Sequence, residues 1–176
     1  MLCRPPESEV PSFFRGYVDA VPEGEGGVVE ILAGQLRSFP ALLRQFPEAR
    51  TEVGYAPGKW SLKQATEHVS DTERIFSYRL LRIARGDQTP LAGFEQDGYV
   101  ANSQANARPW SEIVEEFEAV RRATLALVRP LPDSAWIRTG TSSGAHASAR
   151  LFACVIAGHV AHHARVIESN YAALLK

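Results

Sequence analysis

Three of the five histidines in this 176-residue chain lie in one short apolar segment, GHVAHHARV, at residues 158–166. In an α-helix, residues four apart lie one turn above each other, so His159 and His163 would share a face and His162 would lie to one side. That face is the apolar stripe of the segment, where a helical bundle usually carries leucine. A buried imidazole without a partner costs about 1–3 kcal/mol, so these two rings should have hydrogen-bonding partners or a metal.

A metal ion can satisfy both rings at once, because two imidazoles one turn apart on a helix can bind the same ion. A third ligand must then come from another element. His68 is the better candidate, since it lies beside the apolar stripe of a well-bounded helical segment, whereas His146 lies in a loop of Ser, Gly and Ala. Three neutral imidazoles with an open fourth position form a catalytic zinc-type site. The set suits zinc and nickel, although cobalt, iron and copper also accept imidazole.

A second interpretation needs no metal, because an HxxxH pair in an apolar helix can consist of two hydrogen-bonded core residues. The pair alone does not decide between a metal site and a satisfied core. We expect His162, at the edge of the stripe, to face solvent or to support a ligand rather than to bind the metal.

The helical segment around His68 continues into a run of alternating charge, DTERIFSYRLLRIARGD, at residues 71–87. The ordinary explanation is a solvated helix face with ion pairs worth about 0.2–0.5 kcal/mol each. The alternative gives these residues a part in the site. Asp71 could orient the imidazole of His68, or Arg79 or Arg82 could point into a cavity and hold an anionic substrate.

Four helices are expected to position these residues, and no alternation typical of strands is sustained. The second begins at Ser61, which forms a capping-box pattern with Gln64, and ends at Gly86. Pro40 should kink or break the first, and Ser111 should cap the third. The four ranges are about 27–46, 61–86, 110–129 and 148–172, with a long connection at 87–109. These features predict an all-α protein, a four-helix bundle with one long crossover loop.

Composition and charge narrow the classes of function. Nineteen basic and twenty acidic residues give a net charge of -1, which disfavours nucleic acid and anionic membranes as partners. The chain has no apolar run of about 18 residues and no apolar core of a secretory signal near its start, so we expect a cytoplasmic protein. The two cysteines, Cys3 and Cys154, form no disulfide framework. We expect a partly ordered lead-in at 1–22 and one domain at 23–176.

Three stretches together resemble the DinB-like (DinB/YfiT) superfamily of metal-binding four-helix bundles. They are YAPGKWSLKQATEHVSDTERIFSYRLLRIARGD, PLAGFEQDGYVAN and GHVAHHARVI, and with the helix spacing the resemblance covers roughly residues 11–170. It implies an up-down-down-up bundle, often a homodimer, with a three-histidine site at His68, His159 and His163. Some members of the family are S-transferases that use the thiol bacillithiol.

We therefore expect a metal-dependent enzyme that transfers a small-molecule thiol to an electrophilic substrate. A metal-bound thiol loses its proton near neutral pH and becomes a nucleophile. Two alternatives stay open. Metal-bound water would make the protein a hydrolase, and a closed site would make it a metal-binding, stress-related bundle without turnover.

Overall fold

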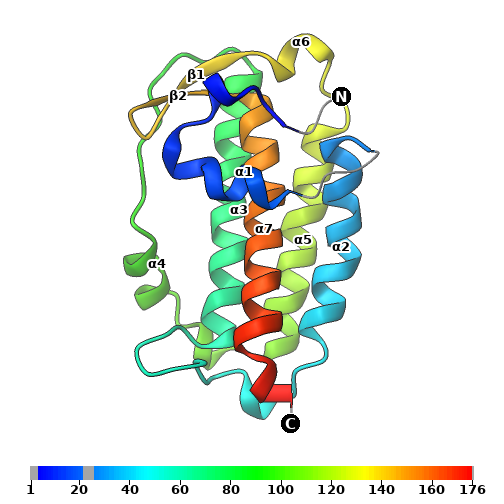
Figure 1. Cartoon of the computed structure of the whole chain (residues 1–176), viewed down its shortest axis with the longest axis vertical. Coiled ribbons are helices and arrows are strands. Elements are labelled where there is room, and N and C mark those ends of the chain that lie inside the picture. The colour runs from blue at the N-terminus through cyan, green and yellow to red at the C-terminus, as the bar shows by residue number, and fades with distance from the viewer. Residues whose placement is uncertain (1–3, 22–25, 176) are drawn as a thin grey trace.

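The computed structural model describes residues 4–21 and 26–175, and its centre is a bundle of four long helices (Figure 1). These are α2 (Val28–Leu43), α3 (Leu62–Ala84), α5 (Trp110–Val128) and α7 (Ala149–Asn170). In Figure 1, α2 and α7 run downward and α3 and α5 run upward. The predicted all-α, up-down-down-up bundle is confirmed. The predicted boundary at residues 22 and 23 lies outside the described residues, as does Cys3.

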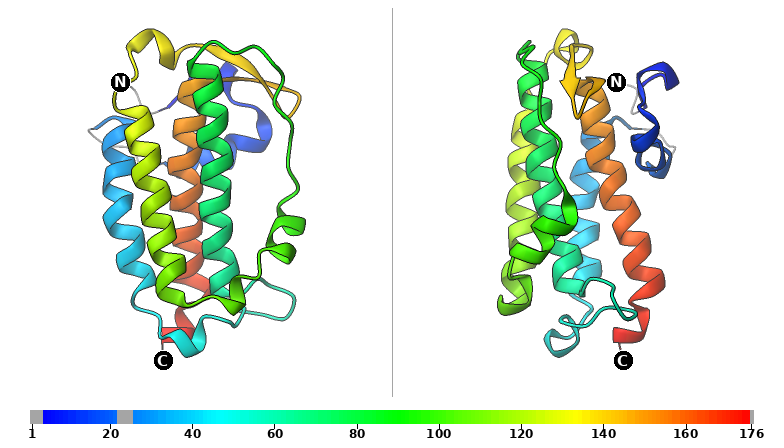
Figure 2. Two further views of the ribbon diagram at one scale, coloured as in Figure 1. Left: turned by 180° about the vertical axis from the view of Figure 1, so that it is seen from behind. Right: turned by 90° about the vertical axis from the view of Figure 1, so that its left-hand side faces the viewer.

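A long crossover joins α3 to α5 because these two helices run in the same direction. It passes along the whole length of the bundle beside α3 (Figure 2). It contains the short helix α4 (Gln96–Asn102) and the 3-10 turn η4 (Ala105–Ala107). Among the described residues, no helix is long and apolar enough to cross a membrane.

The ends of the two helices that carry the histidines are set by local sequence. At the start of α3, the Gln64 amide donates to Ser61 Oγ (3.1 Å) and the Ser61 amide donates to Gln64 Oε1 (2.9 Å), as the capping box predicts. Gly86 follows the end of α3 with a positive φ of 82°, which a residue with a side chain adopts at a cost. Ser148 caps α7 by accepting from the Leu151 amide at 3.2 Å.

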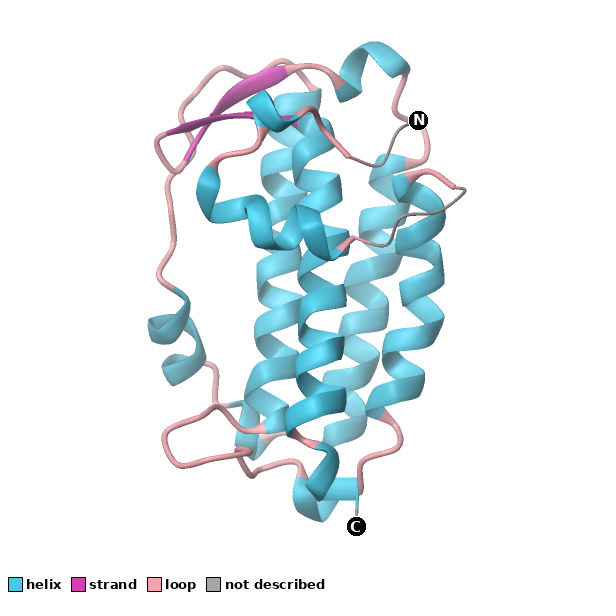
Figure 3. Cartoon of the chain, viewed as in Figure 1, coloured by secondary structure: helices cyan, strands magenta, loops and turns pink. Residues whose placement is uncertain are grey.

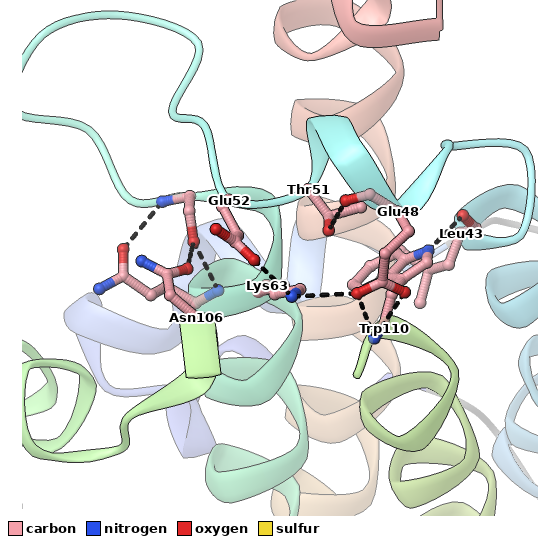
Figure 4. A network of polar contacts seen from close by, with 9 residues as sticks. Leu43, Glu48, Thr51, Glu52, Lys63, Asn106 and Trp110 are labelled. Atoms are coloured by element: carbon pink, nitrogen blue, oxygen red, sulfur yellow. Dashed lines mark hydrogen bonds and ion pairs between the residues drawn. The ribbon is translucent and has the colours of Figure 1, made fainter. Parts of the chain in front are cut away.

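The start of α5 differs from the prediction. The helix begins at Trp110 after Pro109, and no side chain at its N-cap accepts a hydrogen bond, so Ser111 is not the cap. Instead, the Trp110 amide donates to the carboxylate of Glu48 at 3.0 Å (Figure 4). Glu48 opens the 3-10 turn η3 (Glu48–Arg50), and its carboxylate also pairs with the buried Lys63 at 3.1 Å. A distant carboxylate thus satisfies the free amide of this helix terminus.

Two further expectations are corrected by the structure. Pro40 does not break α2, which continues to Leu43; the proline removes only the hydrogen bond that its own amide would have donated, and the helix ends three residues later. The loop after the short helix α6 (Asp133–Trp136) contains an antiparallel hairpin of β1 (Thr139–Ser142) and β2 (Ala145–Ser148). Its turn residues, Ser143 and Gly144, both have positive φ, as tight hairpins require. The hairpin is coloured as strand in Figure 3.

The N-terminal segment crosses the outer face of α7 (Figure 1). It forms the 3-10 turns η1 (Glu7–Glu9) and η2 (Ser12–Phe14) and then α1 (Arg15–Ala20); a last turn, η5 (Ala172–Leu175), follows α7. Phe14 is buried against Phe76 and Phe152, with ring centroids 5.7 and 5.9 Å away. Because Gly158 has no side chain, the backbone of α1 can lie against α7 at this point. These contacts hold α1 over the middle of α7.

The core consists of two apolar clusters that meet in the middle of the bundle. The first contains Phe76 from α3 and the apolar residues of α7 up to Ala157, and the second contains Val69 from α3 with Val160 and Ile167 from α7. His159 lies between them. The histidines of α3 and α7 are therefore placed inside the bundle, with apolar packing on either side.

Candidate functional site

Three histidines converge between α3 and α7. The Nε2 atoms of His68 and His159 are 3.2 Å apart. The ring centroid of His163 lies 5.2 Å from that of His68 and 4.5 Å from that of His159. One ring nitrogen from each of the three lies within 4.8 Å of the others. The structure thus brings together the three residues that the sequence singled out, and the arrangement gives three nitrogen donors around one point.

The surroundings of the rings hold all three histidines in the neutral state. His68 and His159 are buried, and His163 is partly buried. Burial lowers the pKa of His68 to about 4, and burial together with the neighbouring histidines lowers the pKa of His163 to about 3. The pKa of His159 is well below its ordinary value for the same reasons. Near pH 7 each ring therefore keeps a free lone pair, the form that binds metal ions.

Neighbouring side chains fix the orientation of these rings. Thr72, one turn along α3, places its Oγ1 3.4 Å from Nδ1 of His68. With Nδ1 facing this hydroxyl, Nε2 of His68 faces His159 and is available as a donor atom. Asp71, which the sequence suggested for this task, instead pairs with Arg74 at 3.1 Å. The ring of Tyr17 in α1 packs edge-on against His159, with centroids 5.1 Å apart.

The two other histidines do not converge on the same point as these three. His162 is exposed, and its ring packs edge-on against those of His163 and Tyr17. His146 is exposed in β2. Neither belongs to the group of side chains whose ring nitrogens converge.

A cavity of about 380 Å³ opens beside the cluster and is lined by His68 and His159, so these two rings are accessible to a small molecule. Its walls come from η2, α1, α3, α7, the crossover and the hairpin. The lining residues are Phe13, Phe14, Tyr17, His68, Thr72, Phe76, Arg79, Phe94, Glu95, Gln96, Ser143 and His159. Aromatic rings supply much of this wall, which suits a ligand with an apolar body.

The sequence did not assign Tyr17, Thr72 or the aromatic wall of the cavity to the site. The cluster FFRGYV at 13–18 was a visible signal, since aromatic residues outside a helical stripe need a surface to pack on. Arg79 and Arg82, the two candidates for holding an anionic substrate, lie in different places. Arg79 lines the cavity, whereas Arg82 contacts Asp87 and Tyr78.

Comparisons with known proteins agree with this fold. No curated protein matches the chain. Among solved structures, the fold is similar to YfiT from Bacillus subtilis, described as "a probable metal-dependent hydrolase with an unusual four-helix bundle topology". The two share 15% sequence identity with a TM-score of 0.71, over 97% of this chain and 92% of that one. The sequence profile of the DinB superfamily matches residues 31–167. Because this match spans most of the chain, the protein belongs to the DinB superfamily.

Proposed function

We propose that His68, His159 and His163 bind one divalent transition metal, zinc or nickel, and that the protein is a metal-dependent enzyme acting on a small molecule. The convergence of three neutral imidazoles beside an accessible cavity carries this proposal. The donor set suits either metal. Two other residues contribute through position: Thr72 orients His68, and Tyr17 covers His159.

A purely structural role explains the cluster less well. A ring nitrogen of His68 and one of His159 face each other, so one must donate and the other accept. Within residues 4–21 and 26–175, His163 has only ring contacts and no hydrogen-bond partner for its nitrogens. Hydrogen bonding therefore accounts for the pair of His68 and His159 but not for the third ring, which converges on the same point. A bound metal ion would satisfy all three rings together.

We infer thiol transfer as the reaction, with hydrolysis as the second candidate. A bound metal ion would supply positive charge that lowers the pKa of a thiol or water beside it. No cysteine is among the residues that line the described cavity, and Cys154 is buried within α7, so the nucleophile would be a molecule that enters from solvent. Resemblance to S-transferases of the family favours a thiol, and the aromatic wall favours an electrophile with an apolar body.

The chain's own residues would position and protect these reactants. Tyr17 and the phenylalanines would exclude water from most of the cavity, which strengthens electrostatic interactions inside it. Burial raises the pKa of Tyr17, so its hydroxyl keeps its proton at neutral pH and can donate a hydrogen bond. A homodimer and a cytoplasmic location stay predictions.

Metal content tests the first half of the proposal. Elemental mass spectrometry on untagged protein should find about one transition metal per chain. A variant with His68→Ala, His159→Ala and His163→Ala should contain none, while His146→Ala, at an exposed position, should keep the metal. Absence of metal from the parent, even after reconstitution with zinc and nickel, would overturn the metal site.

Product analysis tests the second half. The metal-loaded protein is incubated with an aryl halide and a panel of low-molecular-weight thiols, and separately with an aryl ester. A thioether product that depends on the three histidines supports thiol transfer, whereas hydrolysis of the ester alone identifies a hydrolase. Metal binding without turnover of either probe class would favour a metal-binding bundle.

A further inference from the structure

The guanidinium of Arg79 is buried in the wall of the cavity without an acidic partner. Arg79 is only 3% exposed. Its guanidinium lies against the rings of Phe76 and Phe94, with Cζ 5.5 and 5.7 Å from their centroids. Its Nη2 donates to the carbonyl oxygen of Ala92 at 2.7 Å. No carboxylate of the described residues lies within ion-pair distance of Arg79. One carbonyl leaves most of the five N–H donors of a guanidinium without a protein acceptor.

Another buried arginine shows how this chain satisfies a guanidinium that serves the fold. Arg121 is fully buried, and its Nε and Nη2 donate to the two carboxylate oxygens of Glu73 at 2.7 and 2.8 Å. Its Nη1 donates to the Leu32 carbonyl (3.0 Å) and to Gln35 Oε1 (2.9 Å). An unpaired buried charge is costly, so a structural arginine is normally paired in this way. Arg79 lacks such a pair although it is almost as deeply buried.

Arg82, three residues further along α3, also differs from Arg79 in that its guanidinium has an acidic partner. Its guanidinium contacts Asp87 and the hydroxyl of Tyr78, and it does not line the cavity beside the histidines. The only carboxylate among the residues lining this described cavity is that of Glu95. Its oxygens accept from the amides of Asp97 (3.3 Å) and Gly98 (2.9 Å), so they cap α4.

Arg79 lines the same cavity as His68 and His159, and the ring of Phe76 lies between Arg79 and His159. His68, Thr72, Phe76 and Arg79 follow each other on α3 at steps of four, four and three residues, which places them on one face. The centroid of the Phe76 ring lies 5.5 Å from Cζ of Arg79 and 6.3 Å from the centroid of the His159 ring. A small molecule lying over Phe76 could therefore reach both Arg79 and His159.

We propose that Arg79 binds a carboxylate of the substrate, so that the protein acts on organic anions with an apolar or aromatic body. The carboxylate would accept two N–H bonds from the guanidinium and replace the missing acidic partner. The apolar body would lie over Phe76 and Phe94 and extend toward the histidines. What then happens at the histidines rests on the proposed function, but the anion site itself needs no metal.

Binding of a matched pair of probes tests this site. Protein stripped of metal with a chelator and then dialysed is titrated by calorimetry with phenylacetate and with its neutral isostere phenylacetamide. Phenylacetate should bind at least about tenfold more tightly, the difference expected of a charge-assisted hydrogen-bonded pair. The preference should disappear in Arg79→Met and persist in the matched control Arg82→Met. Arg79→Lys should keep part of it, because the charge remains but the bidentate geometry is lost.

Equal binding of both probes to the parent, or no detectable binding of either, overturns the proposal. So does a preference that survives in Arg79→Met. If Arg79→Met fails to fold, the preference for phenylacetate in the parent and its reduction in Arg79→Lys test the proposal instead. The metal content of the same proteins separates the two proposals. If the parent binds metal but does not prefer the carboxylate, only the Arg79 site is refuted. If the parent prefers the carboxylate but binds no metal, only the metal centre is refuted.

Discussion

The clustered histidines differ from His146 in how far solvent reaches their rings. Burial penalises the charged form of an imidazole. His68 and His163 have pKa values lowered to about 4 and about 3 in the folded chain. The same surroundings that make these rings ready ligands therefore also make them a source of instability in acid.

We expect the metal-free protein to lose stability as the pH falls from about 6.5 toward 4. In this range the unfolded chain, with ordinary histidine pKa values near 6.5, binds more protons than the folded chain, whose His68 and His163 have lowered pKa values. Each such histidine contributes up to about 1.4 kcal/mol per pH unit. The free energy of unfolding in urea, measured at several pH values, gives the slope.

Substitution of one histidine tests whether the pH dependence of the free energy of unfolding comes from the three-histidine cluster. His163→Gln should reduce the slope below that of the parent, because one titrating ring is removed from the buried group. His146→Gln, at an exposed position in the hairpin, should leave the slope unchanged. Equal slopes in the parent and His163→Gln would contradict the assignment.

Among the elements, α1 depends on one position of α7 for its place over the site. A Cβ built at Gly158 would lie 1.8 Å from the carbonyl oxygen of Tyr17. Gly158→Ala should therefore displace α1 and lower the free energy of unfolding by about 1–3 kcal/mol, as overpacking does. Trypsin should then cleave after Arg15 faster than in the parent.

The matched control for this substitution is Gly34→Ala in α2, where a Cβ meets nothing within 4 Å. Alanine favours the helix over glycine by roughly 0.5–1 kcal/mol, so this variant should be as stable as the parent or more so. Urea unfolding compares the two variants. Similar stabilities for them would contradict the close approach of α1 to α7.

The elements differ in how far local sequence determines them. The ends of α3 were predictable because Ser61, Gln64 and Gly86 act through their own neighbours. The capping of α5 was not predictable, since the amide of its first residue, Trp110, donates to Glu48, 62 residues away in sequence. The hairpin escaped prediction because its strands have only four residues each and are rich in Gly, Ser, Thr and Ala. Local patterns identify an element only where local interactions stabilise it.

The same distinction holds for the site. Helical spacing was enough to select His159 and His163, because both lie on one face of one helix. It could not separate Arg79 from Arg82, which differ in what the crossover places beside them: Ala92 and Phe94 for the first and Asp87 for the second. It could not place Tyr17 over His159 either, because that contact depends on how α1 docks.

At the scale of the whole molecule, metal binding should appear as added stability. The ion would bind the folded chain, where the three rings converge, in preference to the unfolded one. At a free metal concentration about 100 times Kd, the gain is about 2.7 kcal/mol, or roughly 5–10 °C in Tm for a chain of this size.

Differential scanning calorimetry with zinc or nickel, against protein in chelator, measures this shift. The triple histidine variant should show the same Tm in both conditions, because it lacks the cluster but keeps the rest of the bundle. An equal shift in the parent and the variant would place the ion elsewhere on the protein.

The crossover between α3 and α5 separates the chain into a part that contains α2 and α3 and a part that contains α5 and α7. The first part carries His68, and the second carries His159 and His163. Neither part alone contains the full set of imidazoles. A single cut in the exposed crossover would therefore turn the site into a junction between two fragments, and their reassociation would become a bimolecular event that the shared ion could promote.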